Sequence, residues 1–540
     1  MSDDVLQLDV DGVQVEVPAD GASLLEVLRD RLGHRSAKDG CSPQGQCGCC
    51  TVLVDGAPRV ACVTPARRVA GRQITTLDGL APEERTAWAE AFCATGASQC
   101  GFCTPGIIVR LSGLRQRGTD AADHGAVERA LGAHLCRCTG WRTITEAWDL
   151  VAAPAPAGSG MDSGGPDPAD PCQNATPSAV RQRDLEAAGR RATIEGHAPQ
   201  RVGADVALGR GGFADDTAPA GALVAVPDGA GGWAVGETLV EARARAGKVQ
   251  GRRTTVAPSH PLDVPPGDWA VTLRTAWVEP AYLETDASWC APGGEPTSPL
   301  ANGGAFGAKV DSAVGRAARA LADHHGRPVR VLLSREDTVR SGPKRPPVAA
   351  GVRADGTGVV RVVRTPGVAA AVTATAPGLR VEELAVAGPP TSVGLRAAGW
   401  AEAAVLLAGA AGRPLPVRSP SGGQAEADLS GDRLRVRVAC GDPLDTVVLR
   451  SYCIGAAHMA LGWVRSEGLA VDAEGQVDDL TVRSFGILRS ADMPPVDVEI
   501  EPSTGPPVNG SDAVFAAVAA AAWIDQGCPQ DWPTSRGARR

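Results

Sequence analysis

Two groups of cysteines carry the clearest chemistry in this sequence. In the first group, two cysteines separated by five residues are followed by a third after two residues and by a fourth after eleven. The second group pairs a Cys-x-x-Cys with a later Cys-x-Cys. A [2Fe–2S] cluster needs four thiolates, two on each iron, so each group can hold one cluster. The predicted ligands are Cys41, Cys47, Cys50 and Cys62 for the first cluster, and Cys100, Cys103, Cys136 and Cys138 for the second.

The same cysteines also allow a less specific interpretation, as a zinc site or as unrelated thiols. Two four-cysteine patterns in succession favour iron–sulfur clusters over both alternatives. Cys49 is a spare thiol beside the first group, and the sequence predicts no role for it.

Length and charge limit what else the chain can be. Its 540 residues are too many for one core, and 66 glycines and 42 prolines predict a loop-rich protein of several domains. The formal net charge of −9, without a long basic run, argues against a nucleic-acid partner. We see neither a secretory signal nor an apolar run long enough to span a membrane, and we expect a cytoplasmic protein. In that reducing compartment, fifteen cysteines favour metal binding over disulfides.

The elements around the first cysteine group are predicted to form a small sheet. Apolar and polar residues alternate over 5–10 and 13–17, and the Asp11-Gly12 pair between them is a strong hairpin signal. The motif Ser23-x-x-Glu26 is typical of a capped short helix. A loop rich in small residues then carries three of the cysteines, and a second hairpin delivers the fourth. Small residues let the backbone wrap closely around a cluster.

Short helices are predicted around the second cysteine group. Thr104-Pro105 is a favourable helix start, and apolar residues follow it at helical spacing. The same spacing recurs from Ile144 to Val151, and segments 83–93 and 125–134 supply two more helices. Two of the cysteines would then lie where one helix begins, and the other two in a loop between helices.

The motifs QCGFCTPG and LCRCTGW closely resemble the helical [2Fe–2S] domain of the molybdenum hydroxylases, the family of xanthine dehydrogenase, aldehyde oxidase and carbon monoxide dehydrogenase. The segment before them resembles a plant-type ferredoxin of β-grasp fold, although its first cysteine gap is five residues instead of the usual four. The resemblance covers residues 1–153. It implies that the second cluster lies nearer the molybdenum and that the first passes electrons outward.

A resemblance to the family's molybdopterin-binding subunit follows a Pro-, Gly- and Ala-rich linker at 153–180. The segment GGAFGAK at 303–309 resembles the family's GGxFGxK cofactor loop. Arg396 lies in a segment resembling a loop whose arginine faces substrate, and Asp512 stands where the family has the glutamate that acts as general base. The resemblance thus implies two catalytic residues, Asp512 and Arg396, and a cofactor loop of Gly303, Gly304, Phe306, Gly307 and Lys309.

The residue types at these positions support the implied roles and also allow other interpretations. Glycines let the loop approach an anion, and a helical pattern from Val310 to Gly326 predicts a helix N-terminus that favours a phosphate or oxo ligand. Asp512 is also a good N-cap for an alanine-rich helix predicted over 513–524, so base and cap both stay open. Arg396 equally suits a salt bridge. Val310 replaces the substrate-binding glutamate of purine-oxidising relatives, which disfavours purines.

These features together predict a multidomain α+β protein. Its parts are a β-grasp plant-type ferredoxin domain (1–78), a four-helix [2Fe–2S] domain (79–152), a linker (153–180), a reduced mixed α/β molybdopterin-binding-like region in two parts (181–350 and 351–531), and a tail (532–540).

Two functions are compatible with this organisation. The first is an oxidoreductase enzyme, similar to xanthine dehydrogenase and aldehyde oxidase. It would oxidise a small aldehyde or heteroaromatic substrate at a molybdopterin centre and pass electrons through both clusters to an FAD-binding subunit or another acceptor. The second is a non-catalytic electron-transfer subunit whose C-terminal half is a docking scaffold. The lost glutamate and the absence of the family's glutamine-rich cofactor motif favour the second. The preserved order of the motifs favours the first, which is the function that we expect. In a third possibility, a partner subunit supplies the missing cofactor contacts.

Overall fold

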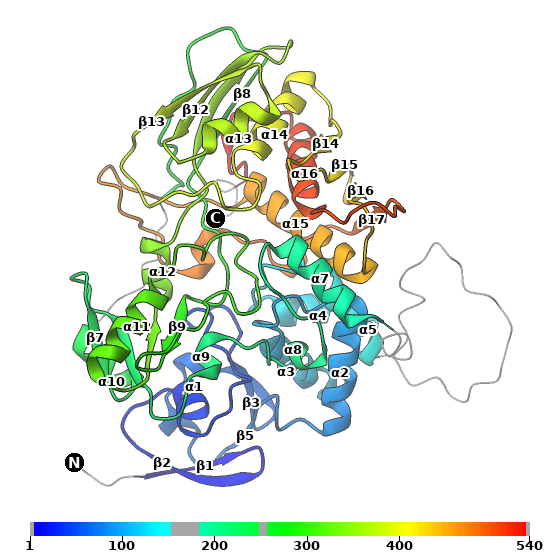
Figure 1. Ribbon diagram of the computed structural model, residues 1–540. Coiled ribbons are helices and arrows are strands. Elements are labelled where there is room, and N and C mark those ends of the chain that lie inside the picture. The colour runs from blue at the N-terminus through cyan, green and yellow to red at the C-terminus, as the bar shows by residue number, and fades with distance from the viewer. Residues whose placement is uncertain (1–4, 153–182, 248–255, 536–540) are drawn as a thin grey trace, which may run out of the picture.

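The computed structural model describes residues 5–152, 183–247 and 256–535 (Figure 1). Its N-terminal part is a five-stranded sheet of order β2-β1-β5-β3-β4, in which β1 and β5 are parallel and the other neighbours antiparallel. The Ser23 hydroxyl accepts the Glu26 backbone N–H at 3.2 Å and starts the short helix α1. The β-grasp prediction is confirmed, with Val5–Val10 (β1), Val13–Pro18 (β2), Leu24–Glu26 (α1), Thr51–Val54 (β3), Ala57–Val60 (β4) and Gln73–Thr75 (β5).

Four helices follow this sheet, as the apolar spacing predicts. Trp88 and Trp148 pack in their core, with ring centroids 6.3 Å apart. The loop between α4 and α5 carries the later pair of the second cysteine group, and α3 begins directly after the earlier pair. The helices are Pro82–Thr95 (α2), Thr104–Gln116 (α3), His124–Leu131 (α4) and Arg142–Ala152 (α5).

The chain then returns across both N-terminal parts through α7 (Leu185–Gly196), α8 (Ala204–Ala207) and α9 (Ala214–Thr217). It builds a four-stranded sheet of order β7-β6-β10-β9 that lies beside the ferredoxin sheet (Figure 1). The helices of this layer are Leu239–Ala246 (α10), Val314–His325 (α11) and Arg335–Ser341 (α12), and its strands are Leu223–Pro227 (β6), Trp233–Gly236 (β7), Ala287–Cys290 (β9) and Val329–Leu332 (β10).

Two more sheets make up the far end of the molecule (Figure 1). One has the order β13-β12-β11-β8-β18 and the other the order β14-β15-β16-β17. The first contains Val271–Thr275 (β8), Val348–Val352 (β11), Gly358–Val363 (β12), Leu379–Leu384 (β13) and Asp531–Trp532 (β18), with helices Val368–Thr375 (α13) and Trp400–Ala411 (α14). The second contains Val417–Arg418 (β14), Gln424–Ser430 (β15), Arg433–Ala439 (β16) and Val496–Ile500 (β17), with helices Thr446–Arg465 (α15) and Ser511–Asp525 (α16).

Helix α15 runs through the centre of this packing. The expectation that no apolar run is long enough to span a membrane is wrong for α15. By length and composition this helix could span one, but 89% of its apolar window is buried inside the protein. Its Trp463 stacks on Phe515 of α16, with ring centroids 5.3 Å apart. The apolar surface of α15 is therefore covered by protein, as expected for a core helix.

Candidate functional site

The first cysteine group gathers in one buried place. Three of its members lie in the loop between α1 and β3, and the fourth lies in a short helical turn after β4. All four are at most 4% exposed. The sulfur of Cys41 lies beside those of Cys47 and Cys62, and the sulfur of Cys62 also lies beside that of Cys50.

Backbone N–H groups point at these sulfurs. Those of Gln44 and Gln46 donate to Cys41 Sγ at 3.3 and 3.5 Å, and that of Cys62 donates to Cys50 Sγ at 3.4 Å. Hydrogen bonds from the Cys47 and Cys62 thiols and from this backbone hold the pKa of Cys41 well below its usual value. The thiolate is the form of cysteine that binds metal. Hydrogen bonding with Cys41 raises the pKa values of Cys47 and Cys62. The loop therefore favours the anionic form at Cys41.

The second cysteine group forms two sulfur pairs. Cys138 Sγ lies 3.7 Å from Cys100 Sγ, and the sulfur of Cys103 lies beside that of Cys136. Hydrogen bonding from Cys103 lowers the pKa of Cys136 to about 6. Among the described residues no three His, Cys, Asp or Glu side chains are arranged for a single metal ion. Two pairs of thiols instead suit the two irons of a [2Fe–2S] cluster, each of which takes two protein sulfurs.

One hydrogen bond joins the two groups. The Leu135 backbone N–H donates to the Cys47 carbonyl at 3.0 Å, and Leu135 directly precedes Cys136. The ring of His134 lies against Gly48, where an added Cβ would come within 2.5 Å of the ring. This contact requires a glycine, and the spare Cys49 beside it is fully buried. The backbone of one cluster loop is thereby in direct contact with the other.

The glycine loop at 303–309 lies against the second cysteine group, but its glycines approach protein atoms. A Cβ at Gly304 would lie 3.0 Å from Cys100 Sγ, and a Cβ at Gly307 would lie 1.8 Å from the Gly394 carbonyl oxygen. Gly303, Gly304 and Gly307 all have positive φ angles, of +70°, +83° and +92°. Close packing against the chain itself thus accounts for these glycines.

The charge of Lys309 is also compensated within the protein. Lys309 is 2% exposed, and its Nζ donates to Glu284 at 2.7 Å and to the Pro299 carbonyl at 3.0 Å. Burial raises the pKa of Glu284, although Lys309 opposes this effect. The other side chain of the loop, Phe306, has the Arg396 guanidinium 4.4 Å from its ring centroid.

The prediction that the glycine loop opens directly into a helix is wrong. Helix α11 begins at Val314, seven residues after Gly307, and Val310 is 70% exposed. The residues between form turns, because Lys309 folds back toward Glu284. The loop therefore has no helix N-terminus directed at a bound anion.

Arg396 and Asp512, more than a hundred residues apart, lie side by side in the structure. Arg396 Nε lies 3.1 Å from Asp512 Oδ1, and Arg396 Nη2 donates to Ser511 Oγ at 3.1 Å. Asp512 Oδ2 also pairs with His197 Nε2 at 2.8 Å, and this hydrogen bond raises the pKa of His197. Asp512 is therefore already paired with two basic side chains, those of Arg396 and His197. Its predicted role as an N-cap is wrong, because Gly510 is the N-cap and Asp512 lies in the first turn of α16.

Glu195 completes this network, although no motif in the sequence indicated it. Its fully buried carboxylate accepts the backbone N–H of Ser511 at 2.8 Å and that of Gly510 at 3.1 Å, and pairs with Arg191 at 2.9 Å. A helix N-terminus favours a negative charge. Here Glu195 of α7 supplies it from within the chain. Its only sequence signal was the Arg/Glu spacing of four residues, which is more typical of a solvated helix face.

The space beside the glycine loop is small. Two cavities border it, one of about 10 Å³ near Gly304 and Lys309 and one of about 40 Å³ near Phe306 and Arg396. One water needs about 10–15 Å³, whereas small-molecule sites measure roughly 300–1,000 Å³. Because the charged candidates are also paired internally, the described residues of the loop do not fit a molybdopterin.

The family comparison matches roughly the N-terminal quarter of the chain. Residues 6–77 match the family of 2Fe-2S iron-sulfur cluster binding domains, and residues 76–149 match the [2Fe-2S] binding domain family. The chain thus carries two [2Fe–2S]-binding domains.

Curated relatives match the same part. Over 145 residues the chain is 41% identical to the aldehyde oxidoreductase of Megalodesulfovibrio gigas. This match covers 26% of this chain but only 16% of that relative. It is 38% identical to the nicotinate dehydrogenase small FeS subunit of Eubacterium barkeri and 36% identical to the xanthine dehydrogenase iron-sulfur-binding subunit of Escherichia coli O157:H7. These two matches cover 23% and 26% of this chain, and 78% and 88% of the respective relatives.

Solved structures match the whole chain in fold. The aldehyde oxidoreductase of Desulfovibrio gigas aligns over 96% of this chain and 97% of its own, with a TM-score of 0.64. That of Desulfovibrio desulfuricans ATCC 27774 aligns over the same shares with a TM-score of 0.65. Sequence identity is 14% in both alignments, which supports a common fold and no more. The paired cysteine centres, the relatives and this fold together establish that the chain belongs to the molybdenum hydroxylase family.

Proposed function

We propose that this chain is an electron-transfer component of an oxidoreductase and carries single electrons between two [2Fe–2S] clusters. One cluster is ligated by Cys41, Cys47, Cys50 and Cys62, and the other by Cys100, Cys103, Cys136 and Cys138. The burial of all eight thiols and the pairing of the second four support this assignment.

The contact between Leu135 and Cys47 is the observation that carries the proposal. An electron leaving the second cluster at Cys136 has a route of one peptide unit and one 3.0 Å hydrogen bond to Cys47, a ligand of the first. Such a bonded route needs no mobile carrier and no solvent. The clusters therefore work as a pair, and a variant that lacks one of them loses transfer through both.

The first cluster is the outward end of this route. A groove of about 810 Å³ lies against its loop residues Ser42–Gln46, with α10 and the start of α12 as its other walls. A flavin subunit or another acceptor docked at this groove receives the electrons. Relatives named as small or iron-sulfur subunits of dehydrogenases support the expectation of partner subunits.

In this proposal the C-terminal region covers the clusters and has no molybdopterin of its own. The internal partners of Lys309, Arg396 and Asp512 support that role, as do the small cavities. The second candidate function is the complete hydroxylase acting on a small aldehyde or heteroaromatic substrate. It is favoured by the position of the glycine loop beside Cys100 and by the fold likeness along the whole chain.

Metal analysis separates the two functions. The chain is purified with its neighbouring subunits from a host that makes the molybdenum cofactor, and iron and molybdenum are measured together by mass spectrometry. About four irons and no molybdenum per chain are expected. Near one molybdenum per chain establishes the hydroxylase instead, and fewer than about two irons overturns both functions.

A further inference from the structure

Arg335, at the start of α12 in the C-terminal region, reaches the loop of the first cluster. It is 0% exposed, and its Nη2 donates to the Gly40 carbonyl at 2.6 Å and to the Leu283 carbonyl at 2.7 Å. Gly40 directly precedes the ligand Cys41, and a Cβ at Gly40 would lie 3.1 Å from Cys47 Sγ. A guanidinium from a distant part of the sequence thus lies against the sulfur-lined loop.

The charge of Arg335 has no carboxylate partner among the residues that the structure describes. Its Nε and Nη1 also make no hydrogen bond within that part of the chain, and the ring of Tyr282 lies 5.9 Å from the guanidinium. An arginine is positively charged throughout the physiological pH range. A buried charge left without a counter-charge is costly, so an anion is expected beside it.

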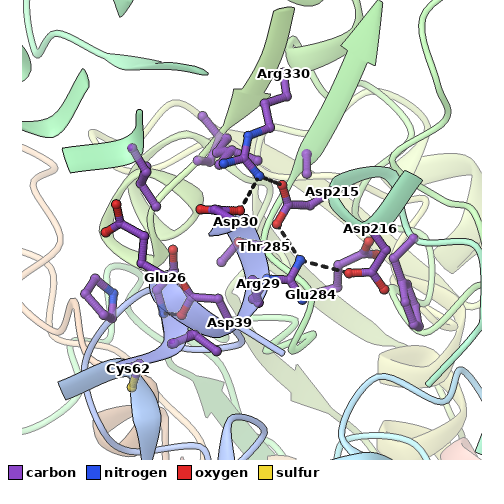
Figure 2. Close-up of a pocket in the computed structure, with 18 of the residues that line it drawn as sticks. Glu26, Arg29, Asp30, Asp39, Cys62, Asp215, Asp216, Glu284, Thr285 and Arg330 are labelled. Carbon is purple, nitrogen blue, oxygen red and sulfur yellow. Dashed lines mark hydrogen bonds and ion pairs between the residues drawn. The ribbon is translucent and has the colours of Figure 1, made fainter. Parts of the chain in front are cut away.

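Neighbouring buried bases contrast with Arg335. In the pocket of Figure 2, Arg29 pairs with Asp215 at 2.7 Å and with Asp216 at 2.8 Å. Arg330 pairs in the same pocket with Asp30 at 3.0 Å and with Asp215 at 2.9 Å. These charges are neutralised by side chains of the protein. Arg335 differs because no carboxylate of the described residues pairs with it, and the loop that it contacts carries the proposed cluster ligands.

Further contacts fix the loop to the same region of the chain. Gln44 Nε2 donates to Glu336 at 2.6 Å and to the Leu480 carbonyl at 2.9 Å, and Arg483 Nε donates to the Gln46 carbonyl at 3.1 Å. The position of Arg335 relative to the loop is therefore set by several bonds. A charge held in a fixed position acts on a cluster without reorganising first.

We propose that Arg335 is a positioning residue for the first cluster, and that its charge raises the reduction potential of that cluster. Reduction adds a negative charge to an already anionic group, and a fixed positive charge in a buried environment stabilises the reduced form. A higher potential at the outward cluster draws electrons from the second cluster toward the acceptor. This inference rests on the proposed function for the presence of the cluster.

The test is a redox titration of the full chain followed by electron paramagnetic resonance. The Arg335→Gln variant removes the charge but keeps a donor for the two carbonyls, and Arg335→Lys keeps the charge. We expect Arg335→Gln to make the ratio of oxidised to reduced first cluster at least tenfold higher at the wild-type midpoint, equivalent to about 59 mV for one electron. Arg335→Lys retains most of the wild-type potential. The second cluster, identified by its loss in Cys103→Ala, does not shift.

Arg483→Gln is the matched control. It removes an exposed charge that contacts the same loop, and water screens that charge. Three results would each overturn the role of Arg335. They are an equal shift in Arg483→Gln, an equal shift of both clusters in Arg335→Gln, and unchanged potentials in Arg335→Gln. If Arg335→Gln does not bind iron, Arg335→Met provides the second neutral variant, and loss of iron in both means that the residue is structural. Absence of two cluster signals in the wild type instead overturns the proposed function.

Discussion

Two loops of this protein contain glycines at positive φ and face the same interior, yet their chemistry differs. In the cluster loop around Cys41 and Cys47, sulfurs and backbone N–H groups face one another. Neighbouring thiols hold the pKa of Cys41 well below its usual value and that of Cys47 well above it. In the loop at 303–309, Lys309 is paired with a carboxylate, and the glycines approach backbone, sulfur or the Gln200 side chain. Residue types that suit a cofactor are present in both loops. The two loops differ in whether the protein itself already supplies a partner for each of their charged and polar groups.

The networks behind the two loops differ in the same way. Glu195 gives α16 the negative charge that a ligand could have provided, and Asp512 neutralises Arg396. By contrast, the guanidinium of Arg335 near the cluster loop has no such counter-charge within the described residues. A resemblance of motifs therefore does not establish a shared site, because a polar side chain that is paired internally is not available to a ligand.

The largest effect is expected from removing a ligand of the second cluster. Cys103→Ala should lose about two of the four irons per chain, since a [2Fe–2S] cluster held by three thiols has an incomplete ligand set. Iron content and electron paramagnetic resonance measure this loss, and the signal of the first cluster should persist. Cys49→Ala is the control and should keep all iron. Equal loss in both variants would show that the spare thiol is a ligand.

Breaking the internal network at α16 should have the next largest effect. It should remove a large part of a typical domain's free energy of unfolding. Glu195→Gln leaves the fully buried Arg191 without its counter-charge, which should lower the free energy of unfolding by about 3–5 kcal/mol. Denaturant unfolding followed by circular dichroism measures the change. Glu186→Gln on the same helix removes an exposed pair and should cost less than about 0.5 kcal/mol. Similar values for the two variants would contradict a special role for the buried carboxylate.

The buried His458 of α15 should make stability depend on acid pH. Burial lowers its pKa from 6.5 to about 4, so the folded protein holds it neutral with Nε2 3.0 Å from the Leu488 carbonyl. The unfolded chain takes up a proton below pH 6.5, and the folded chain does so only near pH 4. Its contribution is therefore complete above pH 6.5 and falls by up to ~3 kcal/mol between pH 6.5 and 4. Burial also lowers the pKa of His134, to about 3, so His134 adds to the same slope. Unfolding titrations of His458→Gln should therefore show a shallower slope than wild type, and those of the exposed His124→Gln should show the wild-type slope.

The smallest effect is expected at His197, which is half-exposed. Its hydrogen bond to Asp512 raises its pKa above 6.5, so the protonated form stabilises the folded state. That contribution is complete below pH 6.5 and is lost as the pH rises through the raised value. Because water screens the pair, the change should stay below about 1 kcal/mol. In His197→Gln the unfolding free energy should differ from wild type at pH 5.5 and not at pH 9. An equal difference at both pH values would assign the effect to packing.

The sequence could predict the N-terminal part closely because its signals are local. Hairpin pairs such as Asp11-Gly12 and the helix start at Thr104-Pro105 depend on a few neighbouring residues, and the structure has both elements where they were expected. The helix predicted from Val310 was wrong by four residues at its start, since its apolar pattern could not reveal that Lys309 turns back to Glu284. Local patterns identify elements but leave their boundaries to tertiary contacts.

The cluster chemistry is encoded locally in the sequence, because eight cysteines at fixed spacing have few other uses in such a chain. The tertiary structure alone decided how the other charged residues are used. It placed Glu195 at the start of α16, joined Arg396 to Asp512, and directed Arg335 to the first cluster loop. These pairs join residues from 116 to 316 positions apart, and no short-range pattern encodes such contacts. The free energy of a buried charge depends on the partner that it meets, and only the folded chain determines that partner.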